Sequence, residues 1–153
     1  MDCYSVAKEV AWSDTDPNSH LRHSAYSDFA THARVSFFAA HGFSLDRLSQ
    51  HQCSPILLRE ETIFLREVLL GEEVQIGVEL KCCTENYSRY TIQHRIRKKN
   101  RKEAARVVVD GAWFHRLTRT FMLPPQLLVT KVLDVVPRAP DFSFAPQDRY
   151  DFV

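Results

Sequence analysis

Two aspartates and two histidines lie close together near the start of the chain, in the segment WSDTDPNSHLRHSAY at residues 12–26. A carboxylate that precedes a helix, such as Asp16, could act as a general base or as a nucleophile. The first backbone N–H groups of a helix have no acceptor within the helix, and their positive partial charge can stabilise a developing anion. The segment therefore has two interpretations, a capped turn before a helix or an active site.

The residues that follow predict the helix that would position these polar groups. Apolar side chains recur at spacings of three and four, which is typical of one helical face. These residues are Tyr26, Phe29, Ala30, Ala33, Phe37 and Ala40. Gly42 suits the left-handed conformation that commonly ends a helix. Residues 43–51 predict only a short helical turn or a loop.

Apolar and polar residues alternate with a period of two on both sides of this helix, which predicts strands. The predicted strands are residues 4–13, 53–66, 74–80, 90–96 and about 103–118. Gly111, inside the last of them, indicates a bulge or a close approach of the backbone. Residues 123–136 predict a helix that begins with proline. The tail at 137–153, rich in proline and aspartate, is expected to be irregular.

The order of these elements predicts an α+β fold, because one long helix is followed by a run of strands without alternation. We expect an antiparallel sheet wrapped around that one central helix. The whole chain, 1–153, is expected to be a single domain with its core at about 4–120. Residues 121–153 would add the C-terminal helix and the irregular tail.

Composition excludes several classes of function. The net charge of +1 gives no electrostatic reason to expect nucleic-acid binding. No segment reaches the roughly 18 apolar residues that a membrane-spanning helix needs, and residues 1–12 do not resemble a signal peptide. The four cysteines, Cys3, Cys53, Cys82 and Cys83, show no zinc-binding spacing. We therefore expect a cytoplasmic protein with reduced thiols and no metal.

The segment at residues 12–26 resembles the signature of the hot-dog acyl-CoA thioesterases, the 4-hydroxybenzoyl-CoA thioesterase-like group. Their pattern is a strand, then D-x-D, a short loop that carries a histidine, and a tyrosine that opens the helix. The matching residues are Asp14, Asp16, His20, His23 and Tyr26. The histidine and tyrosine of this pattern are also similar to those of the bacterial Tol–Pal-cluster thioesterases. Ser19 stands where many relatives carry glycine.

This resemblance implies a hot-dog fold and a role for each residue of the signature. Asp16 would supply the catalytic carboxylate, as general base or nucleophile. The amide of His23 would polarise the thioester carbonyl, and its side chain would orient water or Asp16. His20 and Tyr26 would contact the substrate. Asp14 has a simpler interpretation, as a residue that braces the loop.

The run RIRKKNRKEAAR at residues 95–106 is the only dense group of basic residues, and it is predicted to lie at a hairpin turn. It is either a solvated turn or a site for the phosphates of coenzyme A, bound by Arg97, Lys98, Lys99, Arg101 or Lys102. No glutamate occurs between Tyr26 and Gly42, which disfavours a catalytic glutamate on the helix. Glu61 is expected to form an ion pair or line a cavity, and His94 to be an inward-facing histidine with its hydrogen bonds satisfied.

The predicted function is hydrolysis of an acyl-CoA or acyl-carrier-protein thioester, without metal or cofactor beyond the coenzyme A moiety of the substrate. The resemblance further implies a homodimer or homotetramer that pairs its sheets edge to edge, with the active site at the subunit interface. The alternative is a non-catalytic hot-dog protein that binds acyl thioesters or acts as a scaffold. A hot-dog dehydratase fits the loop less well.

Overall fold

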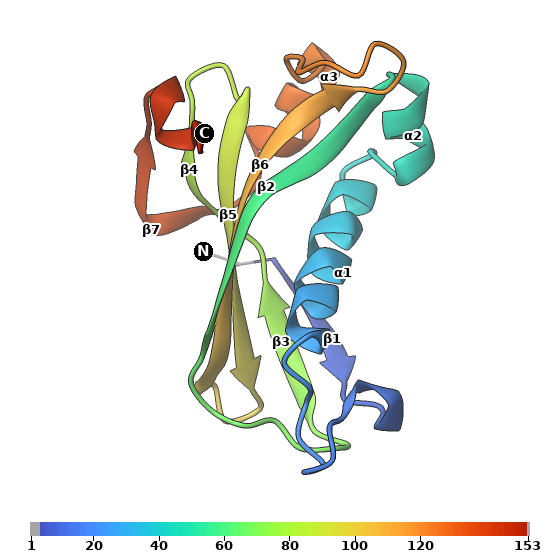
Figure 1. Ribbon diagram of the computed structural model, residues 1–153, viewed down its shortest axis with the longest axis vertical. Helices are drawn as coiled ribbons and strands as arrows, with labels where there is room; N and C mark the ends of the chain where they lie inside the picture. The colour runs from blue at the N-terminus through green and yellow to red at the C-terminus, as the bar shows by residue number, and fades with distance from the viewer. Residues whose placement is uncertain (1–3, 153) are drawn as a thin grey trace.

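In the computed structural model, which describes residues 4–152, seven strands form one sheet and the long helix α1 lies against one of its faces (Figure 1). The strands are β1 (Ser5–Glu9), β2 (Cys53–Phe64), β3 (Glu73–Gly77), β4 (Glu79–Cys83), β5 (Arg89–Lys98), β6 (Glu103–His115) and β7 (Arg138–Phe144). The helices are α1 (Ala25–Ala40), α2 (Leu45–Gln50) and α3 (Gln126–Leu128), which a π-helical segment continues over Val129–Leu133. Two 3-10 segments cover Trp12–Asp14 and Gln147–Tyr150.

The centre of the sheet is the antiparallel pair β5 and β6, and β2 pairs with the other edge of β6. The second edge of β5 pairs with β3 along one part and with β4 along another, both antiparallel. β1 continues the sheet from β3, and β7 continues it from β4. Among the described strands β2 has one partner only, so its outer edge carries no neighbour.

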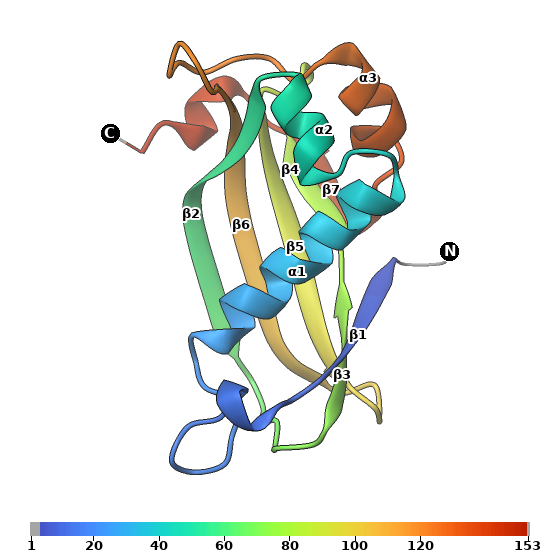
Figure 2. The same ribbon diagram turned by 90° about the vertical axis from the view of Figure 1, so that its right-hand side faces the viewer.

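α1 crosses the sheet diagonally and covers its apolar face (Figure 2). Five residues of the predicted helical face are buried, Tyr26, Phe29, Ala30, Ala33 and Phe37, together with Ala25 and Phe38, whereas Ala40, predicted on the same face, is exposed. The buried residues pack against inward side chains of the sheet such as Ile76, Ile92 and Val107, each of which is fully buried. The predicted α+β class, an antiparallel sheet around one long helix, is confirmed.

The prediction that residues 137–153 are irregular was wrong. Arg138–Phe144 forms β7, which runs parallel to β4. Leu80 donates its amide to the carbonyl of Pro137 (2.7 Å), and Ala145 donates its amide to Cys83 (2.9 Å). Proline lacks an amide donor and is tolerated on an edge strand, so the composition of the tail did not exclude this strand. The strand exists because β4 offers an open edge, which local composition does not reveal.

Three other elements have boundaries that differ from the predicted ones. The predicted strand 74–80 is divided at Val78 into β3 and β4. The predicted first strand, 4–13, ends at Glu9, because Trp12–Asp14 turns into a 3-10 segment. The predicted helix at 123–136 is shorter and spans Gln126–Leu133.

The close approach predicted at Gly111 is present, whereas the bulge lies in the neighbouring strand, β2, opposite this residue. The pairing of β2 with β6 shifts register between Leu57 and Arg59, opposite Gly111 and Asp110, which is a bulge. A Cβ atom at Gly111 would overlap the ring of Tyr90, so the close approach is to a side chain.

Candidate active site

A cavity of about 330 Å³ lies where the segment before α1 meets the end of β2. It is lined by Asp16, His20, Leu21, His23, Tyr26, Phe64, Leu65, Arg66 and Glu67. Four of the predicted site residues, Asp16, His20, His23 and Tyr26, are therefore brought together in one cavity. The segment that the sequence singled out forms one wall, and residues 64–67 form the other.

Two hydrogen bonds within its own loop hold the side chain of Asp16 in place. Its Oδ1 accepts from the backbone amides of Asn18 (2.8 Å) and His20 (3.2 Å). The backbone amide of Asp16 donates to the carbonyl of His20 (2.9 Å), which closes the loop. Within residues 4–152, Oδ2 accepts no hydrogen bond. One carboxylate oxygen is thus fixed by the backbone and the other is available to a ligand or to water.

Backbone hydrogen bonds connect this loop to the segment between β2 and β3. The amide of Leu21 donates to the carbonyl of Val68 (2.7 Å), and the amide of Leu70 donates to Ser19 (3.2 Å). Ser19 has φ +60°, a left-handed conformation that glycine adopts at less cost than serine does. Glycine would therefore suit this position, and the serine here adopts the same conformation.

The predicted bracing role of Asp14 agrees with its contacts. Its Oδ2 accepts a hydrogen bond from the amide of Ala11 (3.0 Å), and its carbonyl accepts from the amide of Arg22 (2.8 Å). Asp14 does not line the cavity.

Unpaired backbone donors lie at the start of α1. Ser24 precedes the helix and makes no capping hydrogen bond with its side chain. Among the described residues, the amides of His23 and Ser24 have no acceptor. Both residues are exposed, and His23 lines the cavity. Free amides at a helix start attract negative charge, so this end of the cavity suits an anion or a polarised carbonyl oxygen.

Tyr26 forms the inner wall of the cavity. It is buried, and its ring meets that of Phe64 edge to face, with centroids 5.2 Å apart. Burial raises the pKa of its phenol above the usual value of 10, and the negative charge of Asp16 raises it further. The phenol is therefore neutral, and its pKa depends on the charge of the Asp16 carboxylate.

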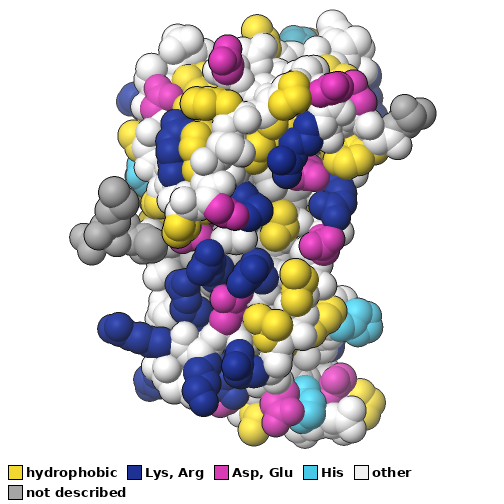
Figure 3. All heavy atoms as spheres, turned by 90° about the vertical axis from the view of Figure 1, so that its left-hand side faces the viewer, with side chains coloured by type: hydrophobic (Ala, Val, Ile, Leu, Met, Phe, Trp, Pro, Cys, Tyr) yellow, Lys and Arg dark blue, Asp and Glu magenta, His cyan; other side chains and the backbone are white. Residues whose placement is uncertain are grey.

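The basic residues Arg97, Lys98 and Lys99 do not line this cavity. Lys98 donates its ammonium to the carbonyl of Glu67 (3.0 Å) and pairs with Glu72 (3.2 Å). Lys99 is exposed in the turn between β5 and β6. Lys and Arg side chains gather on the sheet face that looks away from α1, over the half of the molecule where this turn lies (Figure 3). Of these three cations, Lys98 is the one that contacts the cavity wall, because it holds the segment that contains Glu67.

Two other predictions about side chains are confirmed. Glu61 pairs with Arg59 (2.7 Å). His94 is fully buried, and its two ring nitrogens contact the carbonyl of Gly77 (2.8 Å) and the guanidinium of Arg34 (3.0 Å). Cys53, Cys82 and Cys83 are free thiols, whereas Cys3 lies outside the described residues.

The sequence analysis missed residues 64–67 as part of the site. Ile63, Phe64 and Leu65 are consecutive apolar residues that interrupt the alternation of the strand, and Arg66 and Glu67 resemble a solvated strand end. The backbone hydrogen bonds of Leu21 with Val68 and of Leu70 with Ser19 bring this segment to the loop. In the structure the apolar residues Phe64, Leu65, Leu69 and Leu70 are exposed in the single chain, which indicates that this segment has a partner.

No helix within residues 4–152 has the length and apolar character needed to cross a membrane. The same described part of the chain holds no group of three or more histidine, cysteine or acidic side chains arranged for a metal ion.

Comparison with known proteins identifies a family and a set of similar folds. The model of the thioesterase-like superfamily matches residues 10–142. A search of curated proteins finds no significant match. Among solved structures, a Staphylococcus aureus protein in complex with CoA is 18% identical, with a TM-score of 0.82, over 99% of this chain and 94% of that one.

Two further structures carry the name of a thioesterase. The 1,4-dihydroxy-2-naphthoyl-CoA thioesterase from Synechocystis is 15% identical, with a TM-score of 0.77, over 88% of this chain and 98% of that one. The DHNA-CoA thioesterase from Staphylococcus aureus is 16% identical, with a TM-score of 0.70, over 85% of this chain and 83% of that one. At these identities the structures show a shared fold.

Proposed function

Because the chain belongs to the thioesterase-like superfamily, we propose that it hydrolyses an acyl-CoA or acyl-carrier-protein thioester. The resemblance to the hot-dog thioesterases is confirmed by the family and by the fold. The closer similarity to the Tol–Pal-cluster thioesterases stays a prediction.

One observation carries this proposal. The carboxylate of Asp16 and the start of α1, with the acceptor-free amide of His23, line the same cavity. Thioester hydrolysis needs a group that delivers an oxygen to the acyl carbon and a donor for the oxyanion on the carbonyl oxygen. The cavity offers both, and the family to which the chain belongs supplies the reaction class.

In the proposed reaction, the thioester carbonyl oxygen accepts a hydrogen bond from the amide of His23. Asp16 either removes a proton from the attacking water or attacks the acyl carbon itself and forms an anhydride that water then cleaves. In both routes the C–S bond breaks, the thiol leaves, and the acyl group becomes a carboxylic acid. The two loop amides on Oδ1 hold the carboxylate in one orientation, so that Oδ2 is the oxygen that reacts.

We assign supporting roles to the other cavity residues. His23 and His20 carry imidazoles at the cavity wall, where they orient water or the pantetheine arm. Tyr26 packs against Phe64 and shields the reacting group from water on the inner side.

The free edge of β2 supports the proposal of a homodimer or homotetramer. Its residues Leu57, Ile63 and Phe64 are 44%, 40% and 54% exposed in the single chain. An unpaired edge with exposed apolar side chains is an unfavourable surface unless a second chain covers it. Pairing of two β2 strands would place the cavity, which Phe64 lines, at the subunit interface.

The coenzyme A phosphates would bind beside the cavity mouth. Arg97 and Lys99 are available for this role, and Lys98 contributes positive charge while it holds Glu67 and Glu72. Arg66, which lines the cavity, is a further cation at this mouth. Charge-assisted hydrogen bonds to phosphate are favourable even at a partly exposed site.

The experiment that tests the function is an assay of free thiol release over a panel of short-chain, long-chain and aromatic acyl-CoAs and an acyl-carrier protein. The proposal predicts turnover of at least one class. Calorimetric binding of the same thioesters without thiol release would favour the alternative, a non-catalytic acyl-thioester-binding protein. Binding of none of them would contradict both readings.

A further inference from the structure

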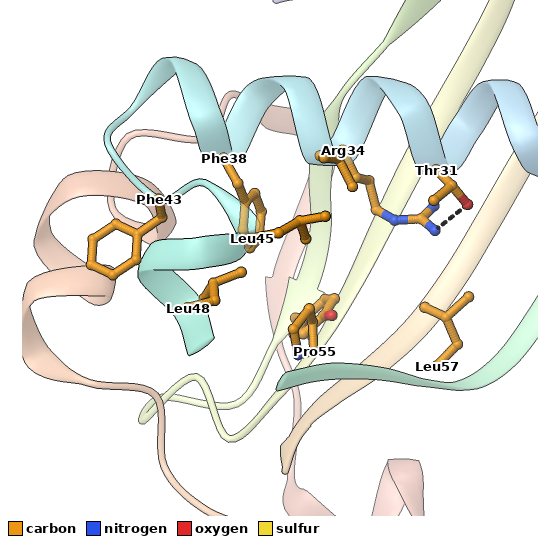
Figure 4. Close-up of a pocket in the computed structure, with 10 residues that line it drawn as sticks. Thr31, Arg34, Phe38, Phe43, Leu45, Leu48, Pro55 and Leu57 are labelled. Atoms are coloured by element: carbon orange, nitrogen blue, oxygen red, sulfur yellow. Dashed lines mark hydrogen bonds between the residues drawn. The ribbon is translucent and has the colours of Figure 1, made fainter. Parts of the chain in front are cut away.

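A second cavity, of about 210 Å³, lies farther along α1, between this helix, α2 and β2 (Figure 4). Apolar side chains form most of its wall: Val35, Phe38, Phe43, Leu45, Leu48 and Leu57. The active-site cavity also lies between α1 and β2. Both cavities thus border α1 and β2, and the hydrogen bond between Ser27 and Glu60 lies between them along both elements.

One cation, Arg34, lies in the wall of this apolar cavity (Figure 4). Its Nη2 donates to the hydroxyl of Thr31 (3.0 Å), and its Nη1 lies 3.0 Å from Nε2 of His94. The other ring nitrogen of His94, Nδ1, lies 2.8 Å from the carbonyl of Gly77 and must carry the proton there. Nε2 is then an acceptor, so His94 is neutral and holds Arg34 without compensating its charge.

No ion pair within the described residues includes Arg34. The charge of Glu60 favours the charged form of Arg34, but this carboxylate accepts a hydrogen bond from Ser27. The phenol of Tyr90, in the same cavity, is neutral because burial raises its pKa to about 12. Burial also lowers the pKa of Arg34, since the surroundings disfavour its charge.

A cation in an apolar cavity is costly unless an anion pairs with it. Two neutral partners hold the guanidinium in the cavity wall, and no carboxylate among the described residues forms an ion pair with it. The cavity is small and mostly apolar, which suits part of an acyl group and does not suit the hydrated phosphates of coenzyme A.

We propose that Arg34 binds a carboxylate at the far end of the substrate's acyl group, so that the preferred substrates are thioesters of dicarboxylic acids. This assignment rests on the proposed thioesterase function and names its substrate class. The apolar wall would contact the methylene chain, and the guanidinium would form charge-assisted hydrogen bonds with the terminal carboxylate.

The geometry of α1 sets the length of such an acyl group. The Arg34 side chain reaches back to Thr31, six residues beyond the first residue of the helix, Ala25. The amide of His23 lies two residues earlier still, so at the rise of an α-helix Thr31 is about 12 Å along the axis from the amide that would polarise the thioester. An acyl chain that joins the two cavities runs past the contact between Ser27 and Glu60. We therefore expect chains of medium length to fit best.

The test compares thioesters that differ only at the far end of the chain. Thiol release is measured with hexanedioyl-, octanedioyl- and decanedioyl-CoA beside hexanoyl-, octanoyl- and decanoyl-CoA. The dissociation constants of the same ligands are measured by calorimetry with the full-length Asp16→Asn protein, which would preserve the bound thioester. Arg34→Met removes the charge and keeps an apolar side chain in the cavity. Arg149→Met removes an exposed arginine of the C-terminal segment and serves as the matched control.

The wild-type protein is expected to favour at least one dicarboxylic thioester over its unsubstituted partner by about 10- to 100-fold in kcat/KM. Arg34→Met should abolish this preference and leave turnover of the unsubstituted thioester unchanged or raised, and Arg149→Met should change neither. Arg34→Lys, which keeps a cation, should retain part of the preference and replaces Arg34→Met if that variant does not fold.

Equal turnover of both ligand types by the wild type, or an equal loss for both in Arg34→Met, would overturn the role of Arg34 and leave the thioesterase function standing. Tighter binding of dicarboxylic thioesters that depends on Arg34, without any thiol release, would support the carboxylate site and refute the hydrolase. If no thioester is bound or cleaved, both proposals fail.

Discussion

His94→Gln should remove a large part of the sensitivity of this protein to mild acid. His94 is fully buried, and its pKa is lowered from 6.5 to about 3, mainly by burial and further by the charge of Arg34. In the unfolded chain this histidine binds a proton near pH 6.5, whereas in the folded chain it stays neutral down to about pH 3. Between these two values the unfolded state binds more protons, so folding stability falls as the pH falls.

The magnitude follows from the two pKa values. Protonation of the unfolded chain at pH 5 stabilises it by roughly 2 kcal/mol relative to pH 7, and the folded state gains almost nothing. His94→Gln keeps a donor for the carbonyl of Gly77 and an acceptor for Arg34, but it does not titrate. The variant should therefore lose about 2 kcal/mol less than the wild type between pH 7 and pH 5.

The assay is urea unfolding of both proteins at pH 7 and pH 5, followed by circular dichroism. The remaining histidines are common to both proteins, so their titration cancels in the difference. An equal loss of stability in the two proteins would refute the reasoning, because it would mean that His94 is protonated in the folded state or does not hold Arg34 as a neutral acceptor.

Three further predictions concern packing, the C-terminal segment and the basic turn. Gly111→Ala should destabilise the fold by about 1–3 kcal/mol, because the new methyl group overlaps the Tyr90 ring. In a Tyr90→Leu background this loss of stability, measured by urea unfolding, should be smaller. An equal loss in that background would mean that the cause is the backbone conformation and not the Tyr90 ring. Tyr150→Phe should lower the unfolding free energy by about 1 kcal/mol, since its buried hydroxyl bonds that of Thr91 (2.9 Å); unchanged denaturation would show that the C-terminal segment is not docked. Lys99→Glu should raise KM for acyl-CoA with little change in kcat if the turn binds the phosphates, and an unchanged KM would assign the turn to solvent alone.

The long helix could be predicted from the sequence because its pattern is local. Apolar residues from Tyr26 to Phe37 follow the helical period, and Gly42 follows the helix end with φ +89°. The strands β5 and β6 could be predicted for the same reason, because their residues alternate between apolar and polar or are continuously apolar over most of their length. Such signals require no knowledge of what lies across the sheet.

The tail could not be predicted in this way. β7 contains Pro140 and Asp141, which disfavour a strand when they are considered alone. Pairing with β4 and the burial of Ala139 and Tyr150 make it ordered. Its structure depends on a partner more than fifty residues earlier in the sequence, so local propensity gave the wrong answer.

The residues of the candidate site fall into the same two groups, those with a local pattern in the sequence and those that only the fold brings together. Asp16, His20, His23 and Tyr26 lie within a dozen residues, and their spacing was enough to group them before the fold was known. Residues 64–67 and the Arg34–His94 pair join residues distant in sequence, and each is an ordinary polar or apolar residue of its own element. Only the folded chain shows that the far wall of the site and the buried cation exist.

The most direct test of the proposed chemistry compares Asp16→Asn with Asp14→Asn in the thiol-release assay. The two substitutions change the same chemical group in the same loop, but only Asp16 lines the cavity, and Asp14 braces the backbone. The proposed mechanism predicts that Asp16→Asn lowers kcat by about 10²- to 10⁴-fold, whereas Asp14→Asn lowers the melting temperature and retains most of the turnover of the folded protein. Turnover in Asp16→Asn equal to that of the wild type would contradict the assignment of Asp16 as the reacting carboxylate.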